Sequence, residues 1–165
     1  MNPFRIEKLS REHPVDGFDC GPQALNIFLH RFALANQQAN ASQTYVGSGQ
    51  GAVIGFYTLV VSEVDVQLAP PRLIKGLARY PVPVMILARL AVDLKWQGKG
   101  VGAGLMRDSM RRTLQAADIA GIRALVVHAK DDAARKFYGH FGFADGFTDP
   151  LHLYVLTKDL KQLVA

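Results

Sequence analysis

The sequence lacks several features that would place it in a particular class of protein. Its 165 residues contain one cysteine, Cys20, so the chain cannot form an internal disulfide and nothing favours an oxidising compartment. No apolar run reaches the roughly 18 residues that a membrane span needs, and the N-terminus lacks the apolar core of a secretory signal. We therefore expect a cytoplasmic protein with no membrane segment.

Internal repeats and low-complexity tracts are also missing, and the length suits one domain with a single core, which we expect to span residues 1–165. Apolar residues make up 49% of the chain and charged residues 20%, which is typical of a globular protein rather than a disordered or fibrous one. The formal net charge is +5, a modest excess that would favour a polyanion such as nucleic acid or a phosphorylated cofactor.

Hydrophobic spacing predicts the elements of the first half of the chain. After Gly21-Pro22, a helix is predicted by the apolar residues Leu25, Phe28, Leu29, Phe32 and Ala35. Residues 47–51 are interpreted as the turn of a hairpin whose second strand is AVIGFYTLVVS. Residues 67–83 hold four prolines and indicate a surface excursion.

The second half of the chain alternates strands and helices. Residues 84–92 are almost all apolar, as in a strand buried on both faces, and a glycine-rich stretch and a helix over residues 101–117 follow. RALVVHA predicts a strand, Asp131 or Asp132 caps a short helix that Gly142 ends, and HLYVL predicts a last strand that closes the chain. This order predicts a mixed α/β fold with a parallel pair of strands around the glycine-rich stretch.

The stretch WQGKGVGAGL, residues 96–105, has four glycines in seven positions between a strand and a helix. Free backbone N–H groups and the positive end of a helix dipole favour an anion at such a place, and the alternative is that the glycines only make a tight turn. A Walker A motif is excluded because no Gly-Lys-Ser/Thr occurs. The Rossmann pattern matches in letters at Gly98, Gly100 and Ala103, but five residues separate it from the strand and the alternating βαβ units are missing.

The same stretch, within LARLAVDLKWQGKGVGAGLM, resembles the acetyl-CoA signature of the GNAT family of N-acetyltransferases, Q/R-x-x-G-x-G/A, which Gln97, Gly100 and Gly102 match. The resemblance extends from Phe18 to Leu156 through FDCGPQALNIFL, VIGFYTLV, RYPVPVMILARLAVD, GIRALVVHAKDDAARKFYGHFGF and DPLHLYVL. These segments are similar to one branch, the tRNA-acetylating toxins of bacterial toxin–antitoxin pairs. The resemblance implies the GNAT fold, a mostly antiparallel mixed sheet flanked by helices, with a parallel pair that splays at the acetyl-CoA site.

Acetyl-CoA as co-substrate, and no metal, is what the resemblance implies. The backbone amides of residues 98–103 would hold the pyrophosphate, the main chain of residues 90–92 would pair with the pantetheine arm, and Lys99 would add a positive charge. The implied cofactor contacts are Leu90, Ala91, Val92, Gln97, Gly98, Lys99, Gly100, Val101, Gly102, Ala103, Asp131, Ala133 and Phe137. Gly104 is expected to loosen the first helical turn, at up to about 1 kcal/mol relative to alanine.

Tyr138, in KFYGHFGF, is the candidate general acid, because the resemblance implies that a tyrosine here protonates the departing CoA thiolate. The alternative is an aromatic stripe buried in the core, to which we expect Phe137 and Phe141 to belong. Tyr138 lies about 100° round the helix from Phe137, so it need not face the same way.

No carboxylate stands out as a general base. Glu63 and Asp65 are candidates near a strand end, where charged residues are usually only solvated. An α-amine has a pKa of about 8, so part of it is neutral at pH 7 without help. A lysine amine, with a pKa of about 10.4, is almost fully charged, so an α-amino acceptor is favoured. The five histidines lack metal-binding spacing and are expected to be ordinary surface or core residues.

Positive charge permits an RNA partner without specifying one. Candidate contacts to tRNA are Arg72, Lys75, Arg79 and Arg31, against the alternative that each is a solvated surface charge. No known RNA-binding module is recognisable, so an aminoacyl-tRNA acceptor is implied by the resemblance alone. The resemblance also implies a cognate ribbon-helix-helix antitoxin, and we expect a homodimer.

The function implied is that of a toxin from a type II toxin–antitoxin pair, which transfers acetyl from acetyl-CoA to the α-amino group of aminoacyl-tRNA and so blocks translation. Two alternatives stay open. One is a GNAT enzyme that acts on a small amine, a peptide N-terminus or a lysine, and the other is an inert CoA-binding module.

Overall fold

The structure, a computed structural model, describes residues 4–164. They form two compact units. The N-terminal unit comprises residues 4–60 and 88–109, and the C-terminal unit comprises residues 61–87 and 110–164. The strands are β1 (Arg5–Lys8), β2 (Gln43–Gly49), β3 (Ala52–Val64), β4 (Val82–Val92), β5 (Ala124–His128) and β6 (His152–Leu156). The helical segments are α1 (Gln23–Ile27), η1 (Phe28–Phe32), α2 (Ala33–Gln38), α3 (Pro71–Ile74), η2 (Leu94–Trp96), α4 (Val101–Ala117), α5 (Asp132–His140) and α6 (Thr157–Leu163).

The strands form a mixed sheet in the order β1-β2-β3-β4-β5-β6. β1 and β3 pair antiparallel with β2, and β6 pairs antiparallel with β5. β4 pairs parallel with β5, from Met85 opposite Leu125 to Leu87 opposite Val127. The parallel pair predicted beside the glycine-rich stretch is therefore confirmed, and so is the mixed α/β class.

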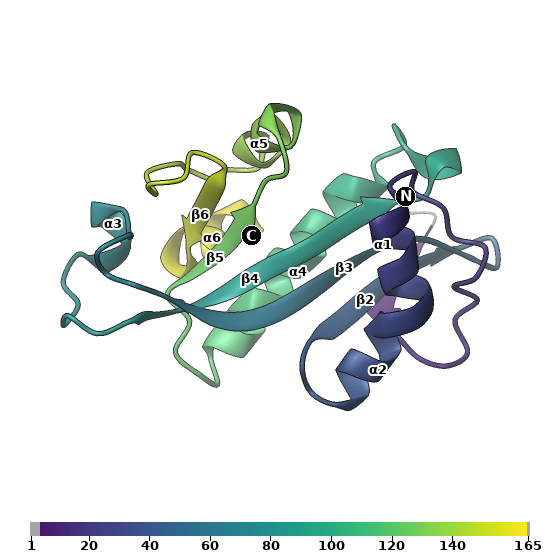
Figure 1. Cartoon of the computed structure of the whole chain (residues 1–165), viewed down its shortest axis with the longest axis horizontal. Helices are drawn as coiled ribbons and strands as arrows, with labels where there is room; N and C mark the ends of the chain where they lie inside the picture. Colours follow the sequence, from purple (N-terminus) through teal and green to yellow (C-terminus); the bar gives the residue numbers. More distant parts are fainter. Residues whose placement is uncertain (1–3, 165) are drawn as a thin grey trace. The chain divides into compact units, whose positions relative to one another are not determined.

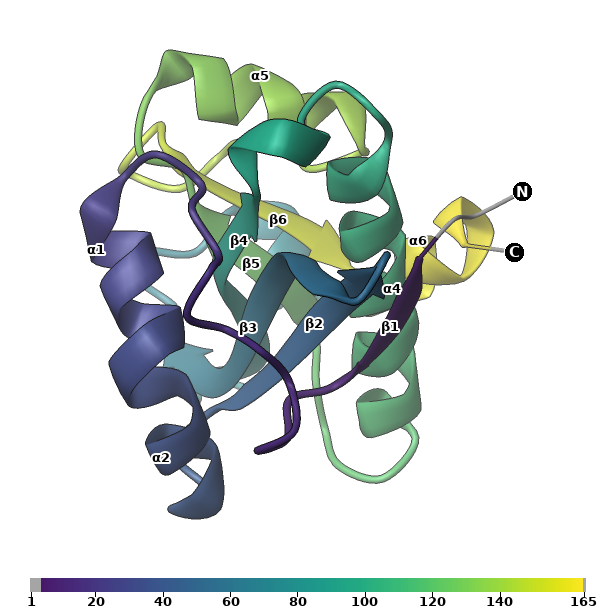
Figure 2. The same ribbon diagram turned by 90° about the vertical axis from the view of Figure 1, so that its right-hand side faces the viewer.

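In the N-terminal unit, α1 and α2 lie on one side of β2 and β3 and the beginning of α4 lies on the other (Figure 2). Phe28 and Leu29 pack against Val46 and Phe56 on the first side. On the second side, a Cβ at Gly55 would lie 2.8 Å from Leu105 Cδ1, so the glycine lets α4 pack closely on β3.

The predicted first helix is present, but part of its predicted buried face is wrong. Phe28 and Leu29 are buried, whereas Phe32 is 51% exposed and Ala33 is buried instead. The cause is η1, a π-helical turn that has more residues per turn than an α-helix and so moves the buried face by one position. Figure 1 shows α1, η1 and α2 as one continuous rod over β2 and β3.

In the C-terminal unit, β5 and β6 lie side by side beneath α5 (Figure 1). Val126 and Tyr154 belong to a core that also contains Leu73 of the predicted proline-rich excursion. Arg123 ties this excursion down by donating from Nε to the Leu73 carbonyl at 2.9 Å. The excursion includes the short helix α3, which the prolines did not predict.

The hairpin turn differs in length from the prediction, and two further short elements were not predicted. The hairpin turn is shorter than residues 47–51, because β2 continues to Gly49 and only Gln50 and Gly51, at φ +52° and +76°, lie outside the strands. β1 was not predicted, since four residues carry little pattern. The chain does not close on β6, because α6 follows it directly. None of the helices between residues 4 and 164 is long and apolar enough to cross a membrane.

Candidate active site

The link between β4 and α4 is an open loop whose backbone requires glycine. Gly98 and Gly100 have φ of +76° and +84°, in the left-handed region that side chains rarely adopt. A Cβ added at either position would meet no atom within 4 Å, so conformation rather than crowding requires these two glycines. The space beside the loop is therefore free for a ligand.

The start of α4 presents unpaired amides to that space. Its first described main-chain bond runs from the Gly104 N–H to the Gly100 carbonyl at 3.1 Å. The amides of residues 101–103 precede it and have no acceptor within the helix. A 17-residue helix adds the positive end of its dipole at this point. Such a cradle fits a pyrophosphate, and the exposed Lys99, whose Nζ lies 5.4 Å from the Trp96 ring centroid, adds a positive charge beside it.

Gly104 has a packing role that the sequence did not reveal. A Cβ at this position would lie 2.8 Å from Cζ of Phe4, which is buried. The glycine therefore makes room for the aromatic ring that precedes β1. The predicted loosening of the first helical turn stays a prediction, and the packing against Phe4 is an additional role.

Asp93, between β4 and η2, anchors the glycine loop to the N-terminal segment. Its side chain is 8% exposed, and Oδ1 accepts a bond from the Lys95 N–H at 2.9 Å. Oδ2 accepts from the Asp19 N–H at 3.1 Å, while the Leu94 N–H donates to the Asp19 carbonyl at 2.8 Å. Asp93 thus joins two segments that are 74 residues apart in the sequence.

A second layer of hydrogen bonds fixes the segment that Asp93 contacts. Oδ1 of Asp19 accepts from Asn26 Nδ2 and from the Gly21 N–H, each at 2.9 Å, and these bonds, led by that from Asn26, lower the pKa of Asp19. Gln97 Nε2 donates to the Val92 carbonyl at 3.0 Å and to the Cys20 carbonyl at 3.4 Å. The first residue of the predicted signature, Gln97, therefore holds the loop against β4 and the N-terminal segment.

Replacing Asp93 with alanine should weaken both the loop and the fold. Two backbone N–H groups would lose a charged acceptor, at roughly 1–3 kcal/mol of unfolding free energy. We expect the KM for the cofactor to rise more than kcat falls, with an intermediate effect for Asp93→Asn, and steady-state kinetics with thermal melting would measure both. Asp16→Ala, at an exposed position in the same unit, is the matched control. An unchanged KM in a destabilised Asp93→Ala protein would show that Asp93 supports only the fold.

Tyr138 lies on α5 in the C-terminal unit. Its ring is half-buried and meets the rings of Phe137 and Phe143 edge-on, with centroids 5.4 and 5.6 Å away. Burial raises the pKa of the Tyr138 hydroxyl, so it carries its proton at neutral pH. No hydrogen bond from this hydroxyl to another residue of the described range 4–164 is present, which leaves the proton available to a ligand.

The neighbours of Tyr138 correct part of the aromatic-stripe prediction. Phe137 is 37% exposed and Phe141 is half-buried, so neither is a core residue, and the buried aromatic side chain is Phe143 beyond the helix. Asp131, rather than Asp132, caps α5 by accepting from the Ala134 N–H at 2.8 Å. Ala133 is exposed in the first turn. These positions leave Ala133 and Phe137 accessible, and their contact with a cofactor stays a prediction.

The candidate bases and metal ligands lie apart from any cluster. Glu63 is exposed, and the Asp65 side chain accepts from the Gln67 N–H at 2.9 Å within a turn. Among residues 4–164, no group of three His, Cys, Asp or Glu side chains could hold a metal ion. His128 and His152 are less ordinary than predicted, because their rings stack at a centroid distance of 3.8 Å and Asp149 lies 3.4 Å from His152 Nε2.

The stacked histidines should make stability depend on pH. Burial, with a smaller contribution from His152, lowers the pKa of His128 from 6.5, although Asp149 opposes this. The unfolded chain then binds this proton at a higher pH than the folded chain, so the unfolding free energy should fall as the pH drops through 6.5. Chemical denaturation from pH 7.5 to 5 should show a shallower fall for His128→Gln than for the parent. The control is His140→Gln, at an exposed position on α5, and a parallel fall in all three proteins would contradict the prediction.

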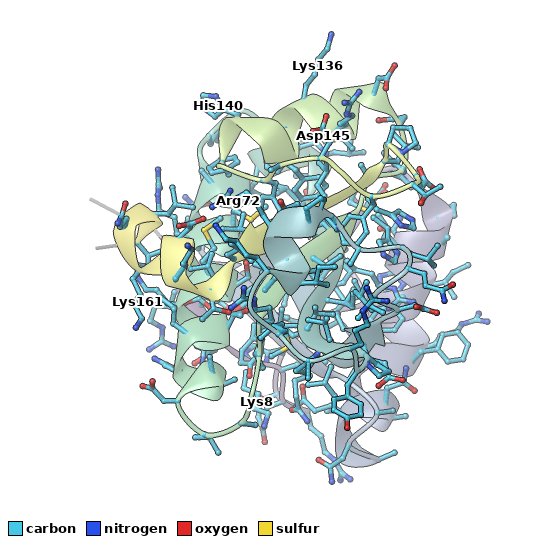
Figure 3. The ribbon with its side chains drawn as sticks, turned by 90° about the vertical axis from the view of Figure 1, so that its left-hand side faces the viewer. Lys8, Arg72, Lys136, His140, Asp145 and Lys161 are labelled. Carbon is cyan, nitrogen blue, oxygen red and sulfur yellow. The ribbon has the colours of Figure 1, made fainter. Side chains whose placement is uncertain are left out.

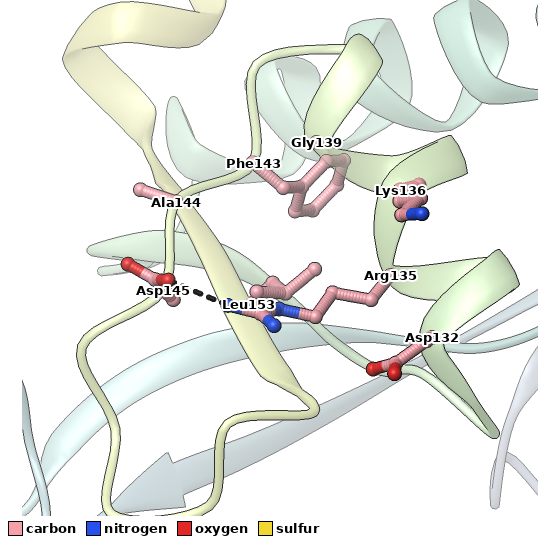
Figure 4. A pocket seen from close by; sticks show the side chains of 8 residues that line it. All are labelled: Asp132, Arg135, Lys136, Gly139, Phe143, Ala144, Asp145 and Leu153. Atoms are coloured by element: carbon pink, nitrogen blue, oxygen red, sulfur yellow. Dashed lines mark hydrogen bonds and ion pairs between the residues drawn. The ribbon is translucent and has the colours of Figure 1, made fainter.

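A cavity of about 370 Å³ lies beside α5, bounded by Arg135, Phe143, Asp145 and Leu153 among others (Figure 4). Arg135 Nη2 and Asp145 Oδ2 form an ion pair at 2.8 Å across it. Lys136 at its edge extends into solvent (Figure 3). None of the predicted site residues bounds this cavity, and its paired charges give it little preference for an anion.

The four predicted tRNA-contacting residues are exposed, but one is paired. Arg72 reaches from α3 towards α6, where its Nη2 lies 3.1 Å from Asp159 Oδ2 (Figure 3). Lys75 and Arg79 follow in the same excursion, beside Tyr80, which is 74% exposed. An exposed aromatic side chain among cations suits nucleobase stacking, and the sequence reasoning missed this residue although its place beside Arg79 could have marked it.

A protein-family model for the acetyltransferase (GNAT) domain matches residues 40–145. The chain is also 44% identical to a tRNA-acetylating toxin of Mycobacterium tuberculosis over 158 residues, which cover 96% of this chain and 95% of the relative. The chain belongs to the GNAT family of acetyltransferases. The glycine loop lies within the matched residues, and the predicted family and fold are confirmed.

Two solved structures of GNAT toxins resemble the whole chain. One is AtaT complexed with acetyl-methionyl-tRNAfMet, with a TM-score of 0.90 and 28% identity over 98% of this chain and 99% of that one. The other is a tyrosine-to-phenylalanine mutant of AtaT bound to acetyl-CoA and to the C-terminus of the antitoxin AtaR. Its TM-score is 0.83, with 28% identity over 98% of both chains. The predictions of an acetyl-CoA-dependent N-acetyltransferase and of acetyl-CoA as co-substrate are confirmed.

Proposed function

We propose that this GNAT protein is the toxin of a type II toxin–antitoxin pair and transfers acetyl from acetyl-CoA to the α-amino group of aminoacyl-tRNA. The observation that carries the proposal is the 44% identity, over 96% of the chain, to a tRNA-acetylating toxin. The function predicted from the sequence is the same. An acetylated α-amine cannot attack a peptidyl ester, so the modified tRNA cannot accept the growing chain and translation stops.

The reaction exchanges one bond for another. Acetyl-CoA supplies an activated acyl group, whose C–S bond breaks as a C–N bond to the amine forms. The amine loses a proton, and the CoA sulfur gains one. Tyr138 would give its hydroxyl proton to the sulfur, and its raised pKa keeps that proton in place at neutral pH until it is needed. The tyrosinate would be reprotonated from solvent.

The open loop supports the predicted binding roles. The amides of residues 98–103 would hold the pyrophosphate, with Lys99 beside it, and Gly98 and Gly100 would keep those amides turned towards the ligand. The main chain of residues 90–92 would pair with the pantetheine arm. Asp131, Ala133 and Phe137 would contact the cofactor from α5. Residues 1–165 would act together as one acetyltransferase domain, since the family match takes in parts of both units.

The same relatives support an aminoacyl-tRNA acceptor and an antitoxin partner. Arg31, Lys75 and Arg79 would contact tRNA phosphates, and Tyr80 would stack on a base. Arg72 would contact a phosphate only if its ion pair with Asp159 broke. AtaT with the C-terminus of AtaR supports a cognate antitoxin here, which we take to be a ribbon-helix-helix protein. The toxin would act as a homodimer in the cytoplasm, where charged tRNA is found.

Transfer of labelled acetyl from acetyl-CoA tests this proposal. The acceptors are a pool of charged tRNAs, deacylated tRNA, free amino acids and a lysine peptide. Label on charged tRNA alone would support the proposal and identify the amino acid. Label on small amines or the peptide alone would replace it with the first alternative function, and CoA binding with no transfer to any acceptor would favour the inert module.

A further inference from the structure

Arg89, on β4, is a cation to which neither the proposed reaction nor the predicted cofactor and tRNA contacts assign a role. Its guanidinium carbon lies 3.7 Å from the centroid of the Phe28 ring, and the side chain is half-buried. Burial lowers the pKa of Arg89, but a guanidinium stays charged at neutral pH because its ordinary pKa lies far above that range. The site therefore keeps a positive charge partly removed from water.

The aromatic residues beneath Arg89 form a rigid shelf in the N-terminal unit. Phe28 stacks on Phe56 with centroids 6.2 Å apart, and Phe18 meets Phe56 edge-on at 5.5 Å. All three rings are buried. Phe28 is also the first residue of the π-helical turn η1, and such turns are often found at functional sites. The stacking fixes the plane of the guanidinium and leaves its N–H edge free.

That N–H edge has no protein partner within residues 4–164. No ion pair between Arg89 and a described carboxylate is present, nor any hydrogen bond from its side chain. By contrast, Arg72 and Arg135 are each paired with an aspartate at 3.1 Å or less. A half-buried guanidinium without an acidic partner is suited to an anionic ligand.

The position of Arg89 limits which anion that is. Arg89 immediately precedes residues 90–92, whose main chain we assign to the pantetheine arm. Strand residues rise about 3.3 Å each, so the Arg89 backbone lies within about 10 Å of that segment. Side chains alternate along a strand, which places Arg89 on the same face as Ala91, and Ala91 packs in the cluster that contains Phe28. Arg89 thus points to the α1 side of β4, next to residues 90–92.

We propose that Arg89 binds the phosphate of the acceptor's terminal nucleotide. This inference rests on the proposed function. The carboxyl group of the amino acid in aminoacyl-tRNA is esterified to the terminal ribose, so it is not an anion. The nearest negative charge to the α-amine is then the 5′-phosphate of that nucleotide. The guanidinium edge matches two phosphate oxygens, and the contact would place the amine beside the thioester.

Two acceptors that differ only in this phosphate test the proposal. They are a 3′-aminoacyl adenosine and the same compound with a 5′-monophosphate, and kcat/KM is measured for the parent, Arg89→Gln and Arg89→Lys. The parent should prefer the phosphorylated acceptor by about tenfold or more, as for a charge-assisted bidentate contact. Arg89→Gln should abolish that preference while changing the unphosphorylated acceptor less than about twofold. Arg89→Lys should keep part of the preference, because lysine keeps the positive charge but lacks the two parallel N–H donors of a guanidinium.

Controls separate this contact from the packing of Arg89 on Phe28. Arg5→Gln removes an exposed arginine of the same unit and should leave the phosphate preference unchanged. Acetyl-CoA affinity should be the same in Arg89→Gln as in the parent. An equal loss on both acceptors, with a lowered melting temperature, would show that Arg89 is structural and overturn the inference. If the parent acetylates neither these acceptors nor charged tRNA, the proposed function fails and the inference fails with it.

Discussion

Tyr138→Phe is expected to lower kcat by about 10²- to 10⁴-fold, the usual contribution of a general acid. The substitution removes one oxygen and keeps the ring that packs against Phe137 and Phe143, so the fold should be unaffected. Because the hydroxyl bonds to no other described residue, its loss leaves no protein group unpaired. The KM for acetyl-CoA should stay within about twofold, since the loss falls on the transition state rather than on binding.

Tyr45→Phe is the matched control for this experiment. Tyr45 is a half-buried tyrosine whose ring stacks on Tyr57 at 5.2 Å in the N-terminal unit. Its replacement should leave kcat unchanged. If Tyr138→Phe retained more than about a tenth of the parent kcat in single-turnover assays, where product release does not intervene, Tyr138 would not be the acid.

Gly100→Ala is expected to raise the KM for acetyl-CoA about tenfold or more. Its φ of +84° costs a residue with a side chain about 1–2 kcal/mol, and the free space around the site shows that no clash adds to this. The strain disappears if the loop turns over, but the amides then no longer converge on the pyrophosphate. The melting temperature should fall by about 2–8 °C.

Gly76→Ala provides a control with nearly the same geometry. Gly76 has φ of +79° and no atom within 4 Å of an added Cβ, but it lies in the proline-rich excursion. This variant should lose similar stability and keep the parent KM. If Gly100→Ala and Gly76→Ala had the same KM for acetyl-CoA, the glycine loop would not hold the cofactor.

The sequence predicted the elements whose cause is local. The apolar run of β4, the period of α4 and the glycines between them are each patterns within a short stretch of sequence. The structure contains all three, with α4 over the predicted residues and β4 beginning two residues earlier than predicted, at Val82. The π-helical turn η1 was not predictable, because nothing in FLHRF distinguishes it from an α-helical turn. The exposure of Phe32 follows from that turn alone. The parallel pairing of β4 and β5 was predicted from order, not from register.

The candidate site could be predicted from the sequence where a motif marks it, but not where distant segments meet. Gly98, Gly100 and Tyr138 belong to recognisable patterns. Asp93 reads in the sequence as the polar end of a strand, and its bond to the Asp19 N–H exists only because two distant segments meet. Arg89 reads as one cation within LARLAV, and only its place over Phe28 sets it apart from other arginines.

The chemical identity of the product tests the central claim most directly. Charged tRNA is incubated with the protein and acetyl-CoA, digested with a nuclease that releases the terminal nucleoside, and analysed by mass spectrometry. The expected product is an N-acetyl-aminoacyl adenosine from one or a few amino acids, which is absent when Tyr138→Phe replaces the parent. Acetyl groups found on a nucleobase, or on protein lysines with unmodified aminoacyl adenosine, would contradict it.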